Sequence, residues 1–293
     1  MTAPLLQIEH LEVRYGDLIG VSDVSLEVPE GSVCGLLGRN GAGKTTAFKC
    51  LLGFARADAG EVRFDGAPLE AHTFAKLGYV PERPELYRWL TVAQHIEYAR
   101  RSQPAFDDAR AKELVATFRL NERKKAGKLS KGQQTALALI LALVHRPKVL
   151  ILDEPASGLD PVMQRVVLDI LVDAATSGAT ILISSHQIGQ IDRAADRVAI
   201  MRDGKIVVAG VIDDLREASR VVEATFAGDV PELTGLDPAM RIERVGTSVR
   251  AHANGRADAV AARFGALGAV GVRVMDRSLE DIFLDAVDDG GNR

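Results

Sequence analysis

Alternating and continuous runs of apolar residues divide the first part of the chain into predicted strands. Residues 6–13 and 24–28 form two short strand patterns, and a turn-rich stretch at 16–20 separates them, as is typical of antiparallel strands. Residues 32–37 are almost continuously apolar and lead into a glycine-rich loop, after which residues 44–52 have helical periodicity. A buried strand, a loop and a helix in this order form the unit of an α/β sheet. Further strands are expected at 61–64 and 77–80.

The pattern changes to long helical periodicities between residue 84 and about residue 145. Residues 92–100 and 109–118 are the clearest helical segments there, and strand candidates are few, so we expect a helical insertion over 84–145. The α/β pattern then returns. It predicts buried strands at 148–152 and 179–184, a helix at 161–176 capped by Asp160, a hairpin of 197–201 and 205–208 around Asp203 and Gly204, and a helix at 212–218.

The length of 293 residues suggests one large domain and a smaller appendage. We expect the first domain to cover residues 1–216 and an accessory domain to cover 217–293. In the second domain, the pattern predicts strands at 220–226 and 240–252 and helices at 257–267 and 278–287, the last opened by the capping box Ser278-x-x-Asp281. The expected fold class is α/β, with an antiparallel β subdomain, a helical insertion and a small α+β C-terminal module.

Composition narrows the classes of function. The net charge is −4, so no overall positive field favours nucleic acid as a partner, although a local basic patch stays possible. The longest apolar run, 136–144, is too short to cross a bilayer, and the first ten residues lack the features of a secretion signal, so a cytoplasmic location is expected. The two cysteines and six histidines show no metal-binding spacing.

Residues 38–45 fit the phosphate-binding motif GxxxxGK[ST], and they lie between a predicted strand and a predicted helix, as the motif requires. Glycines allow backbone N–H groups to surround phosphate oxygens, and Lys44 adds a full positive charge. Thr45 offers a hydroxyl to Mg²⁺. A glycine-rich turn without a ligand is the alternative. The candidate nucleotide-binding residues of this segment are Gly38, Arg39, Asn40, Gly41, Ala42, Gly43, Lys44, Thr45 and Thr46.

The predicted strand at 148–152 is followed by two adjacent carboxylates, Asp153 and Glu154. Successive side chains of a strand face opposite sides, so one carboxylate can hold a hydrated metal ion while the other reaches an attacking water. We assign Asp153 to the metal and Glu154 to the water as general base. An acidic surface turn is the alternative.

A third motif points to a family. Residues 129–133, LSKGQ, resemble the LSGGQ signature of ATP-binding-cassette (ABC) proteins. Further motifs occur in the order typical of the family, and the resemblance covers nearly all of residues 6–210. Tyr15 matches the early aromatic loop, Asp160 ends a stretch similar to the D-loop, and His186 matches the switch histidine. This resemblance implies a head-to-tail homodimer in which ATP lies between the phosphate loop of one subunit and Ser130, Gly132 and Gln133 of the other. A serine that only caps its own helix is the alternative for Ser130.

Two positions depart from the family pattern. Lys131 replaces a glycine of the signature, and Glu82 replaces the Q-loop glutamine, although a carboxylate still offers an oxygen to Mg²⁺. Both variants, and the closing segment 278–284, are similar to the bacitracin- and daunorubicin-exporter branch of the family.

The resemblance therefore implies the ATP-hydrolysing subunit of an ABC transporter, most simply a bacterial exporter. ATP and Mg²⁺ are the expected cofactors, and a separate transmembrane permease is the expected partner, holding the chain at the inner face of the cell membrane. Residues 85–90 resemble the region that receives the permease's coupling helix, or they are aromatics packed against helices. The alternatives are a soluble ABC ATPase of translation or DNA repair and a phosphate-loop kinase or GTPase, which would leave LSKGQ unexplained. The sequence does not name the cargo.

Overall fold

A computed structural model describes residues 4–16, 18–103, 105–237 and 240–288. The chain forms two compact units, Met1–Ala209 and Gly210–Arg293. The division precedes helix α7 (Ile212–Ala218), because α7 packs against helix α9 (Leu279–Asp288) of the second unit. Residue 216 as the end of the functional ATP-binding domain stays a prediction.

The first unit opens with an antiparallel sheet. Its strands are ordered β2-β1-β4-β5, with bounds Leu18–Pro29, Pro4–Tyr15, Ala59–Phe64 and Ala67–Pro68. Val24, Leu26 and Val28 are buried while the residues between them face outward, which is the alternation that predicted a half-buried strand. Strand β2 is longer than expected, because it begins at Leu18, within the stretch predicted as a turn.

A six-stranded sheet forms the centre of this unit, in the order β10-β9-β3-β8-β7-β6. Strands β3, β8, β7 and β6 are parallel, and β9 is parallel to β3. Every residue of β3, β7 and β8 is buried, which explains why their sequences are mainly apolar up to the polar residues at the carboxyl ends of β7 and β8. Strands β9 and β10 form the predicted hairpin, with positive φ at Asp203 and Gly204. The bounds are β3 Val33–Gly38, β6 Leu77–Val80, β7 Val149–Asp153, β8 Thr180–Ser185, β9 Arg197–Arg202 and β10 Lys205–Val211.

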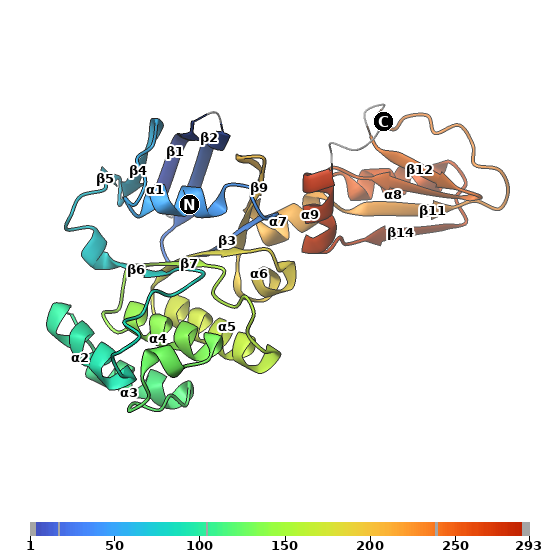
Figure 1. Cartoon of the computed structure of the whole chain (residues 1–293). Helices are drawn as coiled ribbons and strands as arrows, with labels where there is room; N and C mark the ends of the chain where they lie inside the picture. Colours follow the sequence, from blue (N-terminus) through green and yellow to red (C-terminus); the bar gives the residue numbers. More distant parts are fainter. Residues whose placement is uncertain (1–3, 17, 104, 238–239, 289–293) are drawn as a thin grey trace. The chain divides into compact units, whose positions relative to one another are not determined.

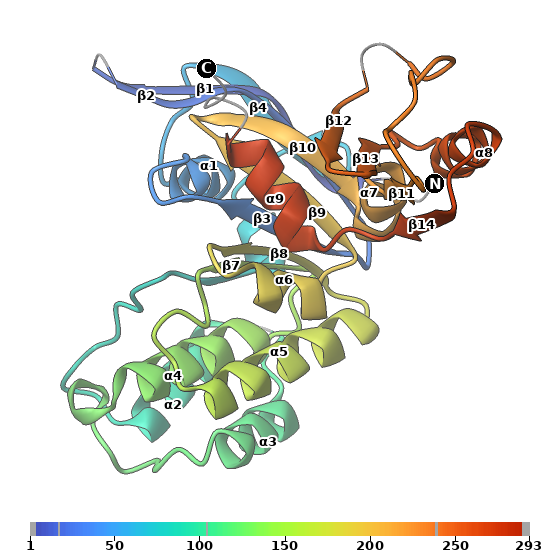
Figure 2. The ribbon, with the colours of Figure 1, turned by 90° about the vertical axis from the view of Figure 1, so that its right-hand side faces the viewer.

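Helices cover both faces of the six-stranded sheet. Figures 1 and 2 show α1 and the antiparallel sheet on one side and the helices α2 to α5 on the other. The predicted helical insertion is present as α2, α3 and α4, of which α4 packs on β6. The bounds are α1 Lys44–Leu51, α2 Val92–Ser102, α3 Asp108–Thr117, α4 Lys131–Leu143, α5 Pro161–Thr176 and α6 Ile188–Ala194, with single turns of 3₁₀-helix at η1 Phe74–Lys76 and η2 Ala126–Lys128.

The second unit is a four-stranded antiparallel sheet in the order β12-β13-β11-β14, packed on helix α8. Its core contains Val222, Val249 and Phe264. The strand predicted at 240–252 is wrong as a single strand, because the chain reverses at Gly246, where φ is 58°. Strand β14 was not predicted. The bounds are β11 Val221–Thr225, β12 Ile242–Val245, β13 Ser248–His252, α8 Ala257–Ala266 and β14 Gly271–Met275.

Helix α9 begins at the predicted capping box. The amide of Asp281 donates to Ser278 Oγ at 3.1 Å, and the amide of Ser278 donates to Asp281 Oδ2 at 3.0 Å. Within the described part of the chain, no helix has the length and apolar character needed to cross a membrane.

Candidate functional site

The carboxyl ends of the parallel strands β3, β7 and β8 bring the predicted catalytic segments to one edge of the sheet. The phosphate-binding motif starts at Gly38, the last residue of β3, and Asp153 is the last residue of β7. Asp153 lies opposite Ser184 in the pairing of β7 with β8, and Ser184 precedes His186 by two residues. This edge is where open α/β sheets bind ligands.

Two glycines of the phosphate-binding loop occupy positions that exclude a side chain. Gly43 has φ of 105°, and a Cβ there would lie 2.5 Å from the carbonyl oxygen of Gly20. At Gly38, a Cβ would lie 2.7 Å from the carbonyl oxygen of Met201. These close approaches hold the loop against β2 and β9, ahead of the N-terminus of α1. The backbone of the loop therefore lies at the N-terminus of α1, where a helix favours binding of an anion such as phosphate.

Lys44 is held at the centre of the loop. Its side chain is 7% exposed, and Nζ donates to the carbonyl oxygens of Gly38 at 2.7 Å and Arg39 at 3.4 Å. Nζ also lies 3.6 Å from Glu154 Oε1. These carbonyl and carboxylate partners hold the Lys44 side chain where phosphate would enter.

Asp153 is suited to hold a divalent cation. The residue is 2% exposed, and its oxygens accept only from hydroxyls, Thr45 Oγ1 at 2.9 Å and Ser184 Oγ at 2.6 Å. No described residue forms an ion pair with it. Burial, and to a lesser degree the charge of Asp153, raise the pKa of Tyr79 to about 12. A buried, unpaired carboxylate beside a hydroxyl is an oxygen donor set that fits Mg²⁺.

Glu154 lies between the lysine and the histidine. Its φ of 51° is unusual for a residue other than glycine, and its amide donates to Ser184 Oγ at 3.0 Å. This turn after β7 lets the carboxylate, 11% exposed, reach His186 Nδ1 at 2.7 Å as well as Lys44. Ser184, which bonds to both Asp153 and Glu154, was not among the predicted site residues.

These groups face a cavity of about 530 Å³. Gly38, Arg39, Asp153 and His186 lie outside its lining, although each contacts a residue that belongs to it. Tyr15 is 51% exposed and stands over Gly20, whose added Cβ would lie 3.0 Å from the Tyr15 ring. The lining comprises Tyr15, Leu18, Ile19, Gly20, Asn40, Gly41, Ala42, Gly43, Lys44, Thr45, Thr46, Glu82 and Glu154. Of these, Leu18, Ile19 and Gly20 were not predicted, and the pairing of Tyr15 with Leu18 across the hairpin places them there.

The remaining predicted residues form a second group outside this cavity. Ser130 caps α4, where its Oγ accepts from the amide of Gln133 at 3.3 Å, and the Gln133 side chain accepts from the Ser130 amide at 3.2 Å. Asp160 caps α5 by accepting from the amides of Val162 and Met163. The two helix starts are neighbours, because a Cβ on Gly132 would lie 3.3 Å from Leu159. In the single chain, Ser130 therefore does cap its own helix, as the alternative interpretation expected.

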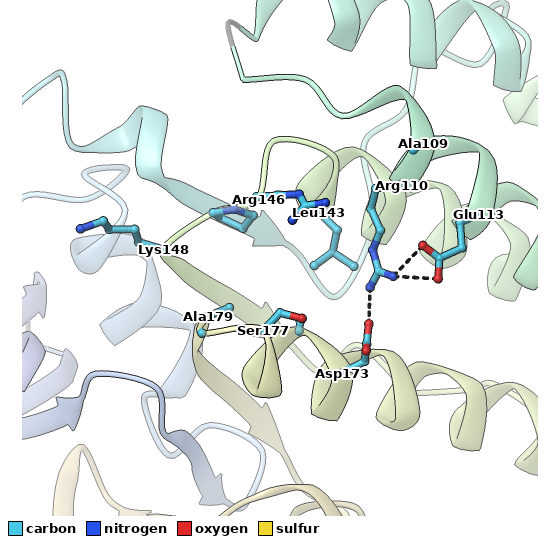
Figure 3. Close-up of a pocket in the computed structure, with 12 residues that line it drawn as sticks. Ala109, Arg110, Glu113, Leu143, Arg146, Lys148, Asp173, Ser177 and Ala179 are labelled. Atoms are coloured by element: carbon cyan, nitrogen blue, oxygen red, sulfur yellow. Dashed lines mark hydrogen bonds and ion pairs between the residues drawn. The ribbon is translucent and has the colours of Figure 1, made fainter.

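A cavity of about 490 Å³ lies away from both groups, between α3 and α5 (Figure 3). Arg110 of α3 is 17% exposed and donates to Glu113 of its own helix and to Asp173 of α5, at 2.8 Å. The charge of Arg110 is therefore paired within the protein, and we interpret this cavity as a junction between α3 and α5.

A glycine-rich loop with a buried lysine, followed by a carboxylate pair and a histidine at one sheet edge, defines a nucleotide-hydrolysing protein of the phosphate-loop class. Residues 21–157 match the family described as ABC transporter. The uncharacterized ABC transporter ATP-binding protein YhaQ of Bacillus subtilis is 35% identical over 230 residues, covering 77% of both chains. The Nod factor export ATP-binding protein I of Burkholderia thailandensis is 33% identical over 303 residues, covering 97% of both.

The structural comparison agrees. The solved structure of an ATP binding subunit of an ABC transporter superposes with a TM-score of 0.67 at 29% identity, covering 72% of this chain and 92% of that one. The chain belongs to the ATP-binding proteins of ABC transporters. It is an ATPase subunit that binds ATP and functions with a membrane subunit, as its motifs predicted, and the translation or repair alternative is not favoured.

Proposed function

We propose that this subunit powers export through a separate permease. The similarity to the Nod factor export protein extends over 97% of both chains, including the C-terminal unit, and this supports an exporter rather than an importer. The cargo contacts the permease, so its identity lies outside this chain. The similarity to the Nod factor export protein carries the direction of transport, and the placement of Glu154 between Lys44 and His186 carries the hydrolysis that powers it.

In this proposal each predicted residue has a defined role. The backbone of residues 38–46 surrounds the ATP phosphates and Lys44 neutralises them, while the exposed ring of Tyr15 stacks on adenine. Thr45, Asp153 and Glu82 hold Mg²⁺, which supplies charge neutralisation at the phosphates when bound. Glu154 accepts the proton of the attacking water, and His186 orients that carboxylate through its 2.7 Å contact.

The signature group supports a head-to-tail homodimer. Ser130, Gly132, Gln133 and Asp160 lie at two neighbouring helix starts, yet none of them lines the cavity of the same chain. Helix starts favour anions, so a second subunit that applies this group to the open side of the cavity would complete the γ-phosphate site. ATP would then stabilise the dimer.

A permease places the subunit on the cytoplasmic face of the membrane, where ATP is available. Copurification from native membranes tests this arrangement. We expect a polytopic membrane protein to be recovered in stoichiometric amount with the tagged chain and to stimulate its ATPase activity after reconstitution. Recovery of ribosomes or of a DNA repair complex instead would contradict the transport function.

A further inference from the structure

Ser184 connects the two carboxylate residues of the site. It lies near the end of strand β8, opposite Asp153 of β7, and its side chain is fully buried. Its hydroxyl donates to Asp153 Oδ1 at 2.6 Å. The same hydroxyl oxygen accepts from the Glu154 amide at 3.0 Å, and the Ser184 carbonyl accepts from that amide at 3.2 Å. One buried residue therefore contacts both the residue that we assign to the metal and the residue that we assign to the water.

The chemistry of the groups fixes the direction of these hydrogen bonds. An amide N–H only donates and an ionised carboxylate only accepts, so the single hydroxyl proton of Ser184 goes to Asp153. The other carboxylate oxygen, Asp153 Oδ2, accepts from Thr45 Oγ1 at 2.9 Å. The two oxygens of Asp153 thus have different partners. Among the described residues, Ser184 alone donates a hydrogen bond to Oδ1.

Ser184 and His186 hold the two ends of Glu154. Ser184 accepts from the amide of Glu154, whose φ is 51°, while His186 Nδ1 lies 2.7 Å from the Glu154 carboxylate. Ser185 turns away from this site, because successive residues of a strand face opposite sides, and its hydroxyl accepts from the Gln187 amide at 2.9 Å. Ser185 is therefore a buried serine of the same strand, with no hydrogen bond to either carboxylate in the described chain.

We propose that Ser184 is a positioning residue of the ATPase reaction, which keeps Asp153 and Glu154 in one relative geometry. Without the hydroxyl, Asp153 Oδ1 is buried with no described partner, and the Glu154 amide loses the closer of its two acceptors. Removal of a group that orients a metal ligand typically lowers metal affinity or activity by about 10- to 100-fold. The inference rests on the roles of Asp153 and Glu154 in the proposed function, and it adds a role for a residue outside them.

Turnover at saturating ATP and Mg²⁺ tests the effect on Glu154. We expect Ser184→Ala to lower kcat at least ~10-fold. Ser184→Thr keeps a hydroxyl and suits a strand, so it should recover most of this loss. Ser185→Ala is the matched control, because it removes a buried hydroxyl from the next position of β8, and it should keep kcat within about threefold of the parent.

Metal binding tests the effect on Asp153 without turnover. Mn²⁺ takes the same oxygen ligands as Mg²⁺, and its binding is followed by electron paramagnetic resonance with full-length protein in excess over ATP. Each variant is made in the Glu154→Gln chain, so that ATP is not consumed. We expect Ser184→Ala to raise the Kd for Mn²⁺ at least ~10-fold, and Ser185→Ala to leave it within about threefold. ATP binding in EDTA should be the same in all variants, because the phosphate-binding loop is intact.

Both losses are required, so parental behaviour of Ser184→Ala in either measurement would overturn the proposal. Equal losses in Ser184→Ala and Ser185→Ala would also overturn it, because they would assign both serines to packing alone. If Ser184→Ala does not fold, Ser184→Val replaces it, since valine has the shape of threonine without the hydroxyl. Asp153→Asn reports separately on the proposed function: parental Mn²⁺ affinity in that variant would show that Asp153 is not the metal ligand, whatever Ser184 does.

Discussion

At the scale of single residues, the site depends on the backbone of Glu154. A non-glycine residue in the left-handed region costs roughly 1 kcal/mol or more, and such strain is found at functional sites when neighbours hold it. Here Ser184 holds it, because both its hydroxyl and its carbonyl accept from the Glu154 amide. The result is a carboxylate that faces Lys44 and His186 at once.

Glu154→Gln should stop hydrolysis and spare ATP binding. The amide keeps the shape of the side chain but is a very poor proton acceptor, so turnover should fall at least ~100-fold. With ATP and Mg²⁺, size-exclusion chromatography should show an ATP-dependent dimer, because the phosphate loop and the signature residues are intact. The exposed Glu30→Gln is the matched control. A monomeric variant with normal turnover would contradict both the base assignment and the dimer.

Ser130→Asp separates the capping role of Ser130 from contact with phosphate. Asp caps a helix as well as Ser does, so the melting temperature should hardly change, whereas Ser130→Ala should lower it. The new carboxylate would face γ-phosphate in the dimer and should weaken ATP-dependent dimerisation at least ~10-fold. Analytical ultracentrifugation with ATP measures this. Unchanged dimerisation of the Asp variant would mean that Ser130 serves only its own helix.

The contact between Lys131 and Gly158 shows the limit of what the sequence could predict about the site. The phosphate loop, the carboxylate pair and the signature are contiguous motifs: the first two follow from residue types in the order strand, loop and helix, and the signature follows from its resemblance to the ABC family. The position of Lys131 could not be predicted, since its Nζ lies over the D-loop, 2.9 Å from where a Cβ on Gly158 would be. The contacts of Gly20 with Gly43 and of Ser184 with Asp153 could likewise not be predicted from the sequence, because they join segments that are far apart in the chain.

At the scale of elements, periodicity predicted the buried parts of the fold best. Strand β6 and helices α5 and α7 have the expected bounds, and in α5 the buried residues Val167, Ile170, Leu171 and Ala174 recur at helical spacing. Strand β14 was missed, since it is an edge strand whose residues are mostly exposed. The hairpin of β12 and β13 was merged into one strand, because Gly246 alone marks its turn.

His145 follows α4 and hydrogen-bonds to β6, and it should make the free energy of unfolding depend on pH. Its Nε2 donates to the Leu77 carbonyl at 3.1 Å, so the buried Nδ1 is an acceptor without a partner among the described residues. Burial lowers the pKa of His145, and the Leu77 carbonyl opposes this only in part. Below pH ~6.5 the unfolded chain therefore binds more protons than the folded chain, and the free energy of unfolding falls with falling pH.

Thermal unfolding at pH 7.5 and 5.5 measures this dependence. His145→Gln removes the titrating group, so the drop in melting temperature between the two pH values should be smaller than in the parent. His72→Gln is the control, because His72 is exposed and its ring forms an ion pair with the exposed Glu70. Identical pH dependence in the parent and in His145→Gln would show that His145 does not limit stability.

At the scale of the whole molecule, the nucleotide site and the C-terminal module belong to different units. All residues that line the cavity, and the signature group as well, precede Ala209. The second unit has its own core around Phe264, which is fully buried. A unit with its own core can fold independently, so ATP binding should not require the second one.

A chain ending at Val211, the last residue of β10, tests this independence. We expect it to fold and to bind ATP with a Kd within about threefold of the parent, or ~0.7 kcal/mol, because its site is complete. Adding Glu154→Gln to the shortened chain then asks what the C-terminal module does. If the ATP-dependent dimer persists by size-exclusion chromatography, the module is not needed to hold the dimer and a regulatory role is favoured. If the dimer is lost while ATP binding is kept, the module supports dimerisation. Loss of ATP binding by a folded chain 1–211 would contradict the separation of the two units.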